Sequence, residues 1–313
     1  MNLVELARPE IQRLQAYAAA EQVQDTIRLN ANEAPPLSTG DRFRRPLNRY
    51  PEVRPQRLQA ALAKRFGCQT EDLLVTRGSS EAIDLLVRSF CRAGQDSILT
   101  TAPSFSMYRH YATIQGAEVI EVPTSAGEDF ALDTEALLAA CKPDTRLIFV
   151  CSPNNPTGTT LAAEQLQQLL EARSKQSAVV VDEAYIEFGD LPSAIALLER
   201  YPNLVILRTL SKALALAGAR CGAVIGQPPV IEMLSAVQAP YALATPVVEC
   251  VEDALTDERL TQAEQAVAGI VVERERLIAA IGGYDFVNRV WPSSGNFFLV
   301  RVEDSQRLMR HCA

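Results

Sequence analysis

The sequence predicts an α/β protein in which a large domain precedes a smaller α+β domain. The large domain is built around a mostly parallel, seven-stranded sheet that is covered on both faces. Two observations indicate this fold. Over residues 70–240, short runs rich in β-branched residues alternate with helical segments, and parallel strands need such crossover connections. After Pro246 a long charged helical stretch replaces the alternation. A chain of 313 residues is long enough for both domains.

Seven strands are expected in the alternating region, because each run is apolar and ends at polar or turn residues. Helices are expected between most of them, since their apolar residues recur at helical spacing. The expected strands are 73–76, 97–101, 119–122, 147–151, 178–181, 205–207 and 223–225. The expected helices include 79–91, 133–141 and 161–173.

The C-terminal part is expected to form the smaller domain. A charged helix over 257–281 ends at two glycines, and two short strands, 286–290 and 296–302, follow. Residues 241–246 connect the two domains. The predicted division is therefore an N-terminal arm and part of the small domain over 1–40, the large domain over 41–240 and the small C-terminal domain over 241–313.

Composition excludes several classes of function. The net charge of −8 argues against nucleic acid as a partner. No apolar run is long enough to cross a bilayer and the N-terminus lacks a signal sequence, so we expect a cytoplasmic protein with no membrane partner. The seven scattered cysteines indicate free thiols. With only two histidines, His110 and His311, neither a histidine metal site nor a serine–histidine triad is expected.

Two charged residues next to apolar strands point to one cofactor. Lys212 follows the strand that ends near Leu207, and an amine in apolar surroundings becomes a nucleophile toward an aldehyde. Asp182 directly follows the strand 178–181, where a carboxylate needs a permanent cationic partner. A pyridinium nitrogen is such a partner. The pair therefore predicts pyridoxal 5′-phosphate.

Other strand ends carry groups that this cofactor needs, although each has an ordinary alternative. Ser79 and Ser80 open a helix, where a phosphate binds well, but serine is also a common helix cap. Asn155 lies in a loop that could be an ordinary turn, or could hold its side-chain amide against a hydroxyl of the cofactor ring. Tyr185 could simply pack beneath a helix and Arg220 could pair with a surface carboxylate. Their joint position at the carboxyl ends of strands favours the cofactor.

These segments resemble the fold type I enzymes that depend on pyridoxal phosphate, of the aspartate-aminotransferase type and the class II aminotransferase family. The likeness spans essentially the whole chain. Its broad elements are Asn-Pro-x-Gly, Asp-x-x-Tyr and Ser-Lys, whereas Leu-Asn-Ala-Asn-Glu and Asn-Arg-Tyr-Pro favour the branch of histidinol-phosphate aminotransferases. The segments are 29–33, 48–51, 151–158, 182–185, 208–212 and 216–222.

The resemblance implies a role for each matching residue. Lys212 would bind the cofactor as a Schiff base and move the substrate proton, and Asp182 would hold the pyridine nitrogen protonated. Tyr185 completes the catalytic set. Around the cofactor, Asn155 and Tyr185 would bind the ring 3′ oxygen and Phe105 would stack on the ring, while Ser79, Ser80, Thr209, Ser211 and Arg220 would surround the phosphate. Tyr50 would reach the phosphate of a neighbouring subunit, which implies a homodimer, and Tyr17 and Asn32 would contact the substrate.

The resemblance implies transamination between L-histidinol phosphate and 2-oxoglutarate, giving imidazole acetol phosphate and L-glutamate, in histidine biosynthesis. Threonine-phosphate decarboxylase, an aromatic amino-acid aminotransferase, and a regulatory or scaffold module that binds the cofactor stay open as alternatives. A Rossmann-type binder is disfavoured because the sequence has no G-x-G-x-x-G motif. Family members continue past the equivalent of His311. We therefore expect the chain to lack the C-terminal end and its substrate-binding arginine.

Overall fold

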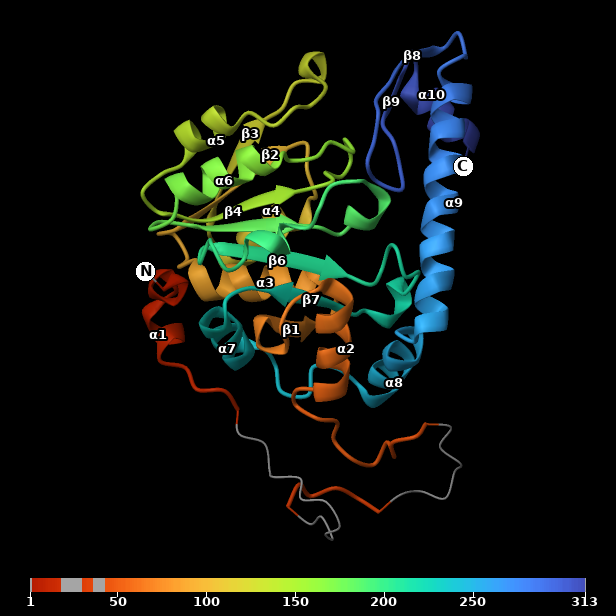
Figure 1. The fold of residues 1–313 in the computed structure, drawn as a ribbon. Coiled ribbons are helices and arrows are strands. Elements are labelled where there is room, and N and C mark those ends of the chain that lie inside the picture. Colours follow the sequence, from red (N-terminus) through yellow and green to blue (C-terminus); the bar gives the residue numbers. More distant parts are fainter. Residues whose placement is uncertain (1, 18–29, 36–42, 313) are drawn as a thin grey trace.

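The computed structural model of the protein describes residues 2–17, 30–35 and 43–312 (Figure 1). Leu29 and much of the expected N-terminal arm lie outside the described residues. A seven-stranded sheet with the order β1-β7-β6-β5-β4-β2-β3 forms the centre of the molecule. Its strands are β1 (Leu73–Thr76), β2 (Ser97–Ala102), β3 (Glu118–Pro123), β4 (Thr145–Cys151), β5 (Ala178–Asp182), β6 (Leu204–Thr209) and β7 (Gly222–Ile225).

The sheet is mostly parallel, as the alternation of strands and helices predicted. The neighbours β3, β2, β4, β5 and β6 pair in parallel, whereas β7 is antiparallel to both β6 and β1. The helices are α1 (Pro9–Gln12), α2 (Gln56–Phe66), α3 (Gly78–Phe90), α4 (Met107–Gln115), α5 (Thr134–Ala140), α6 (Ala163–Ala172), α7 (Pro228–Val237), α8 (Thr245–Ala254), α9 (Asp257–Ile281) and α10 (Ser305–Cys312).

Both faces of the sheet are covered. Side chains alternate along β5, so that Val179 and Val181 belong to the hydrophobic core on one face and Ala178 and Val180 to the core on the other. The first core also includes side chains from α2, α5, α6 and α8, and the second includes side chains from α3, α4 and α7. Burial on both faces explains why these strands are apolar along their whole length.

A second sheet pairs β8 (Val287–Val290) with β9 (Val300–Val302) in antiparallel. The strand expected over 296–302 is shorter than predicted, because the chain before it is held against the loop that follows β4. There the Ser294 N–H donates to Gly158 O at 2.9 Å. Figure 1 shows α9 standing beside the edge to which the arrowheads of β4 and β6 point. From α9, Arg274 Nη1 donates to Phe188 O at 3.0 Å and to Gly295 O at 2.8 Å.

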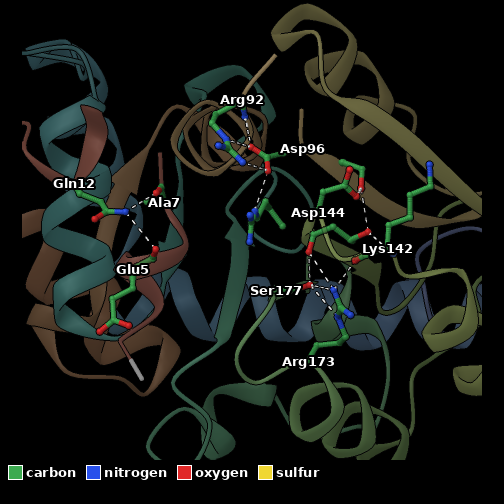
Figure 2. Close-up of polar contacts among 12 residues, drawn as sticks. Glu5, Ala7, Gln12, Arg92, Asp96, Lys142, Asp144, Arg173 and Ser177 are labelled. Carbon is green, nitrogen blue, oxygen red and sulfur yellow. Dashed lines mark hydrogen bonds and ion pairs between the residues drawn. The ribbon is translucent and has the colours of Figure 1, made fainter. Parts of the chain in front are cut away.

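The amino ends of the strands form the opposite edge, where polar groups satisfy one another. Figure 2 shows Arg92 turned toward Asp96 and Arg173 toward Ser177. Asp96 accepts from Arg92 Nε at 2.7 Å and from Arg146 Nε at 3.0 Å. Burial alone would raise the pKa of Asp96, but these bonds and the Arg92 backbone N–H lower it to about 2. This edge therefore stabilises the fold.

All seven cysteines are free thiols, and two of them, Cys250 and Cys312, are exposed. In the part of the chain that the structure describes, no helix is both long and apolar enough for a membrane span. The same residues contain no cluster of three or more His, Cys, Asp or Glu that could hold a metal ion.

Candidate active site

A cavity of about 230 Å³ lies at the carboxyl edge of the sheet. The last residues of three neighbouring strands line it: Cys151 of β4, Asp182 of β5 and Thr209 of β6. The structure thus brings together most of the residues that the sequence singled out. The full lining is Gly78, Ser79, Ser80, Phe105, Cys151, Asp182, Ala184, Tyr185, Thr209, Ser211, Lys212, Ala217 and Arg220.

Asp182 is the buried acid of the cavity, with only 1% of its surface exposed. Its Oδ2 accepts from the Tyr108 hydroxyl at 2.9 Å and its Oδ1 from the Ala184 N–H at 3.1 Å. Burial raises the pKa of Asp182 to about 6, although the two hydrogen bonds and the nearby Lys212 act in the opposite direction. A cationic group bound in the cavity would favour the ionised form of Asp182 and lower its pKa.

Lys212 lies in the loop that follows β6 and lines the same cavity. Its Nζ lies 5.4 Å from the centre of the Tyr185 ring. The sequence indicated apolar surroundings for this amine, but the residue is exposed in the single chain. The loop itself is held in place, since the Leu216 N–H donates to Leu210 O at 3.1 Å and the Ala215 N–H to Lys212 O at 3.2 Å. The amine is therefore accessible to a ligand in the cavity.

Tyr185 and Asn155 form a hydrogen-bonded pair, in which Asn155 Nδ2 donates to the Tyr185 hydroxyl at 3.1 Å. Burial raises the pKa of Tyr185, so the phenol stays protonated. Asn155 is held by its loop, because the neighbouring Asn154 Nδ2 donates to Pro103 O at 3.0 Å and to Thr157 Oγ1 at 2.8 Å. The pair offers a second set of donors beside the buried acid.

The other end of the cavity is suited to an anion. Ser79 and Ser80 lie in the first turn of α3, where backbone N–H groups and the helix dipole attract negative charge. The Ser211 N–H donates to Thr209 Oγ1 at 3.2 Å. Arg220 has a left-handed backbone (φ 52°, ψ 53°) and forms no ion pair with any residue that the structure describes. Its charge remains available for a bound anion.

Three residues that the sequence predicted lie apart from this cavity. Tyr50 stacks on Tyr241 with ring centres 4.7 Å apart, and Tyr17 meets the same ring edge-on at 6.1 Å. Tyr50 and Tyr17 are 51% and 56% exposed. Asn32 has a left-handed φ of 53°. All three fall outside the set of described residues that line the cavity. Their roles as site residues stay predictions.

The sequence analysis did not identify Tyr108 or Cys151. Tyr108 lies in the first turn of α4 and follows Phe105, which precedes the helix, at a helical spacing of three residues. The two rings meet edge-on at 5.7 Å. Cys151 stands opposite Asp182 in the pairing of β4 with β5. The helical spacing was visible in the sequence, whereas the contact with Asp182 depends on how α4 packs against the sheet.

Comparisons with known proteins agree with this geometry. The family described as aminotransferase class I and II matches residues 21–311. A histidinol-phosphate aminotransferase of Xanthomonas euvesicatoria pv. vesicatoria is 42% identical over 97% of this chain and 85% of its own length. Another, from Xylella fastidiosa, is 43% identical over 99% of this chain and 86% of its own.

Among solved structures, a histidinol-phosphate aminotransferase from Sinorhizobium meliloti in complex with pyridoxal 5′-phosphate has a TM-score of 0.74. It is 26% identical, and the alignment covers 84% of this chain and 70% of the solved one. The chain is therefore similar to these proteins in both sequence and fold.

Proposed function

The chain belongs to the family of class I and II aminotransferases, and from this premise we propose that it is a histidinol-phosphate aminotransferase that uses pyridoxal 5′-phosphate. It transfers the amino group of L-histidinol phosphate to 2-oxoglutarate, in histidine biosynthesis. The observation that carries the proposal is the presence of a buried acid, an amine and an anion-binding end in one cavity. Relatives with that name at 42–43% identity support the choice of substrate.

The residues of the cavity fit this cofactor. Its charges are separated, with the Asp182 carboxylate at one end and the Arg220 guanidinium beside the start of α3 at the other. A ring that has a basic nitrogen opposite a phosphate complements both ends. The Lys212 amine lines the same cavity, 5.4 Å from the centre of the Tyr185 ring. Phe105, which also lines the cavity, offers an aromatic face for the ring.

Lys212 and Asp182 are the proposed catalytic pair, with Tyr185 as the third member. Lys212 Nζ would hold the cofactor covalently and would take up the proton from the substrate Cα. Asp182 keeps the proton on the pyridine nitrogen. When bound, the cofactor supplies an aldehyde that accepts the amino group and a ring that withdraws electrons from Cα. Tyr185 and Asn155 bind the ring 3′ oxygen.

The remaining predicted residues complete the proposal. Ser79, Ser80, Thr209, Ser211 and Arg220 bind the cofactor phosphate. The enzyme acts as a cytoplasmic homodimer in which Tyr50 reaches the phosphate of the partner subunit, while Tyr17 and Asn32 contact the substrate. The exposed Tyr50 ring, which stacks on Tyr241, supports a subunit contact in this region. The proposed cofactor domain spans residues 41–240. Residues 1–40 form the N-terminal arm and part of the small domain, and residues 241–313 form the small C-terminal domain.

The proposal is tested with the purified protein and pyridoxal 5′-phosphate. Borohydride should fix the cofactor to the chain, and peptide mass mapping should place it on Lys212. L-histidinol phosphate should then convert bound cofactor to the pyridoxamine form in the absence of 2-oxoglutarate, whereas L-threonine phosphate should release no carbon dioxide. Carbon dioxide release would instead identify a decarboxylase. Cofactor binding with neither reaction would identify a regulatory or scaffold module.

A further inference from the structure

We propose that Tyr108 is a positioning residue of this site: its hydroxyl holds the Asp182 carboxylate ionised and oriented toward the ring nitrogen of the cofactor. The inference rests on the proposed function, because it concerns the group that Asp182 serves. The first turn of α4 would thereby contribute to cofactor binding, which was not expected from the sequence. The support comes from one buried hydrogen bond and from the packing that fixes its donor.

The donor is fixed in place by its surroundings. Tyr108 is fully buried, and its ring stacks on Phe149 of β4 with centres 4.8 Å apart and planes 12° apart. Its hydroxyl reaches Asp182 Oδ2 at 2.9 Å. A tyrosine held flat between the helix and the sheet has little freedom to turn its hydroxyl elsewhere. Burial also raises the pKa of Tyr108 well above its usual value, so it remains a proton donor.

The bonds to Asp182 leave acceptor positions for a further partner. A carboxylate has about four acceptor positions. One on Oδ2 is taken by Tyr108 and one on Oδ1 by the Ala184 N–H. Because Asp182 also lines the cavity, the remaining positions include those open to a ligand. Tyr108 therefore fixes the direction of the carboxylate without occupying the position that a ring nitrogen needs.

The charge of Asp182 depends on few neighbours. Burial favours the neutral acid, and the hydrogen bond from Tyr108 is the largest opposing effect. The other titratable groups that act on it are Glu183, next in the chain, and Lys212, in the loop after β6. Cys151, opposite on β4, also interacts with the pair formed by Tyr108 and Asp182. Loss of the Tyr108 hydroxyl should thus favour the neutral acid.

Tyr108 also connects the acid to the face of the expected ring. Its ring meets Phe105 edge-on at 5.7 Å, and its N–H donates to Phe105 O at 3.4 Å. Phe105 lines the cavity, whereas Tyr108 lies behind it. One buried aromatic side chain therefore sets the position of two groups that touch the ligand.

The test is Tyr108→Phe, which keeps the stacked ring and removes only the hydroxyl. In the cofactor-free protein, infrared difference spectra against Asp182→Asn should show that the pKa of Asp182 rises in the variant. Affinity for pyridoxal 5′-phosphate should fall by roughly tenfold to a hundredfold, as expected for a lost hydrogen bond to a buried charge. Tyr284→Phe, which removes the hydroxyl of an exposed tyrosine in the C-terminal part of the chain, should change neither quantity.

A double-variant cycle shows whether Tyr108 acts through Asp182. Adding Tyr108→Phe to Asp182→Asn should cause almost no further loss of cofactor affinity, because the charge that the hydroxyl served is already absent. Equal losses in both backgrounds, or an unchanged Asp182 titration, would overturn the inference while leaving the proposed function intact. If the wild-type protein bound no pyridoxal 5′-phosphate, both would fail.

Discussion

Asp182 is a buried carboxylate whose ionisation opposes folding of the cofactor-free chain. Its pKa is raised to about 6 from an ordinary value of 3.8, so the folded state binds its proton more tightly than the unfolded state does. The free energy of unfolding should therefore fall as the pH rises from about 4 to 6. An acid kept for function at the expense of folding is typical of active sites.

Asp182→Asn should make the cofactor-free protein more stable above pH 6, by at most about 3 kcal/mol, and no more stable below pH 4. The reason is that asparagine keeps the polar contacts without the buried charge. Urea denaturation from pH 4 to 8 measures the difference. With saturating pyridoxal 5′-phosphate the wild type should be the more stable of the two proteins, since only its Asp182 carboxylate can pair with the ring nitrogen. A variant that was less stable throughout would contradict this account.

At the scale of elements, the amino edge of the sheet depends on Asp96, which links the residues before β2 to β4 through Arg92 and Arg146. Its pKa is lowered to about 2, so it stabilises the fold when the pH is above about 4 and ceases to do so as the pH falls toward 2. Asp96→Asn should cost about 2 kcal/mol at pH 7. The difference in the free energy of unfolding between variant and wild type should become smaller as the pH falls below 4. Denaturant midpoints at several pH values measure this difference in stability. A difference that did not change with pH would show that the ion pairs of Asp96 are not its cause.

The loop that carries Asn155 is held against the segment before β9 by Gly158. This glycine has a φ of 74°, and a Cβ there would lie 2.2 Å from Ser293 Oγ and 2.7 Å from Ser293 Cα. Gly158→Ala should therefore destabilise the protein by more than about 1 kcal/mol and weaken binding of pyridoxal 5′-phosphate. Gly269→Ala, inside α9 with open space around it, should stabilise by about 0.5–1 kcal/mol. Thermal and urea denaturation compare the stabilities of the two variants. If both substitutions changed stability equally, the close contact of Gly158 with Ser293 would not be important for the fold.

Much of the sheet could be predicted because its strands are buried on both faces and read as continuous apolar runs, as in 178–181. The helix over 257–281 was predicted at the same bounds that the structure shows, since its charged sequence ends at two glycines. The strand at 296–302 was predicted too long, because Ser294 pairs with Gly158, far away in the sequence. Such a contact leaves no local pattern.

The candidate site was predictable where a polar group ends a strand or follows it closely, as at Asp182 and Lys212. The role of Tyr108 could not be predicted, because its hydroxyl donates to the Asp182 carboxylate, 74 residues away in the sequence. The exposure of Lys212 also differs from its apolar neighbours in the sequence, since the loop after β6 turns outward. The roles of Tyr17, Asn32 and Tyr50 stay predictions, because the sequence could name these residues only by resemblance.

At the scale of the whole molecule, the proposed dimer predicts complementation between two defective chains. Tyr50→Phe should weaken binding of pyridoxal 5′-phosphate, and Lys212→Ala should abolish its covalent attachment. A mixed dimer contains one site in which Lys212 comes from one chain and Tyr50 from the other. Because that site has both native residues, refolding a mixture of the two variants should restore part of the affinity and the transamination that each lacks alone.

Activity that simply averaged the two parent proteins would show that Tyr50 serves its own chain or none. Tyr284→Phe, an exposed tyrosine beside the small sheet, provides a control that should bind the cofactor like the wild type. Sedimentation of the mixture establishes that the variants still assemble. The experiment thus separates a shared site from a merely shared surface.

The amino edge of the sheet stabilises the fold, whereas the carboxyl edge lines the cavity. This difference matters for protein engineering. The carboxylates and guanidinium groups of the amino edge satisfy one another, so this edge stabilises the fold independently of the exposed residues around the cavity. Libraries that randomise Ala217, which lines the cavity and is exposed, should consequently yield many expressed variants. Selection for a new amino donor can begin there without first raising the thermal tolerance of the scaffold.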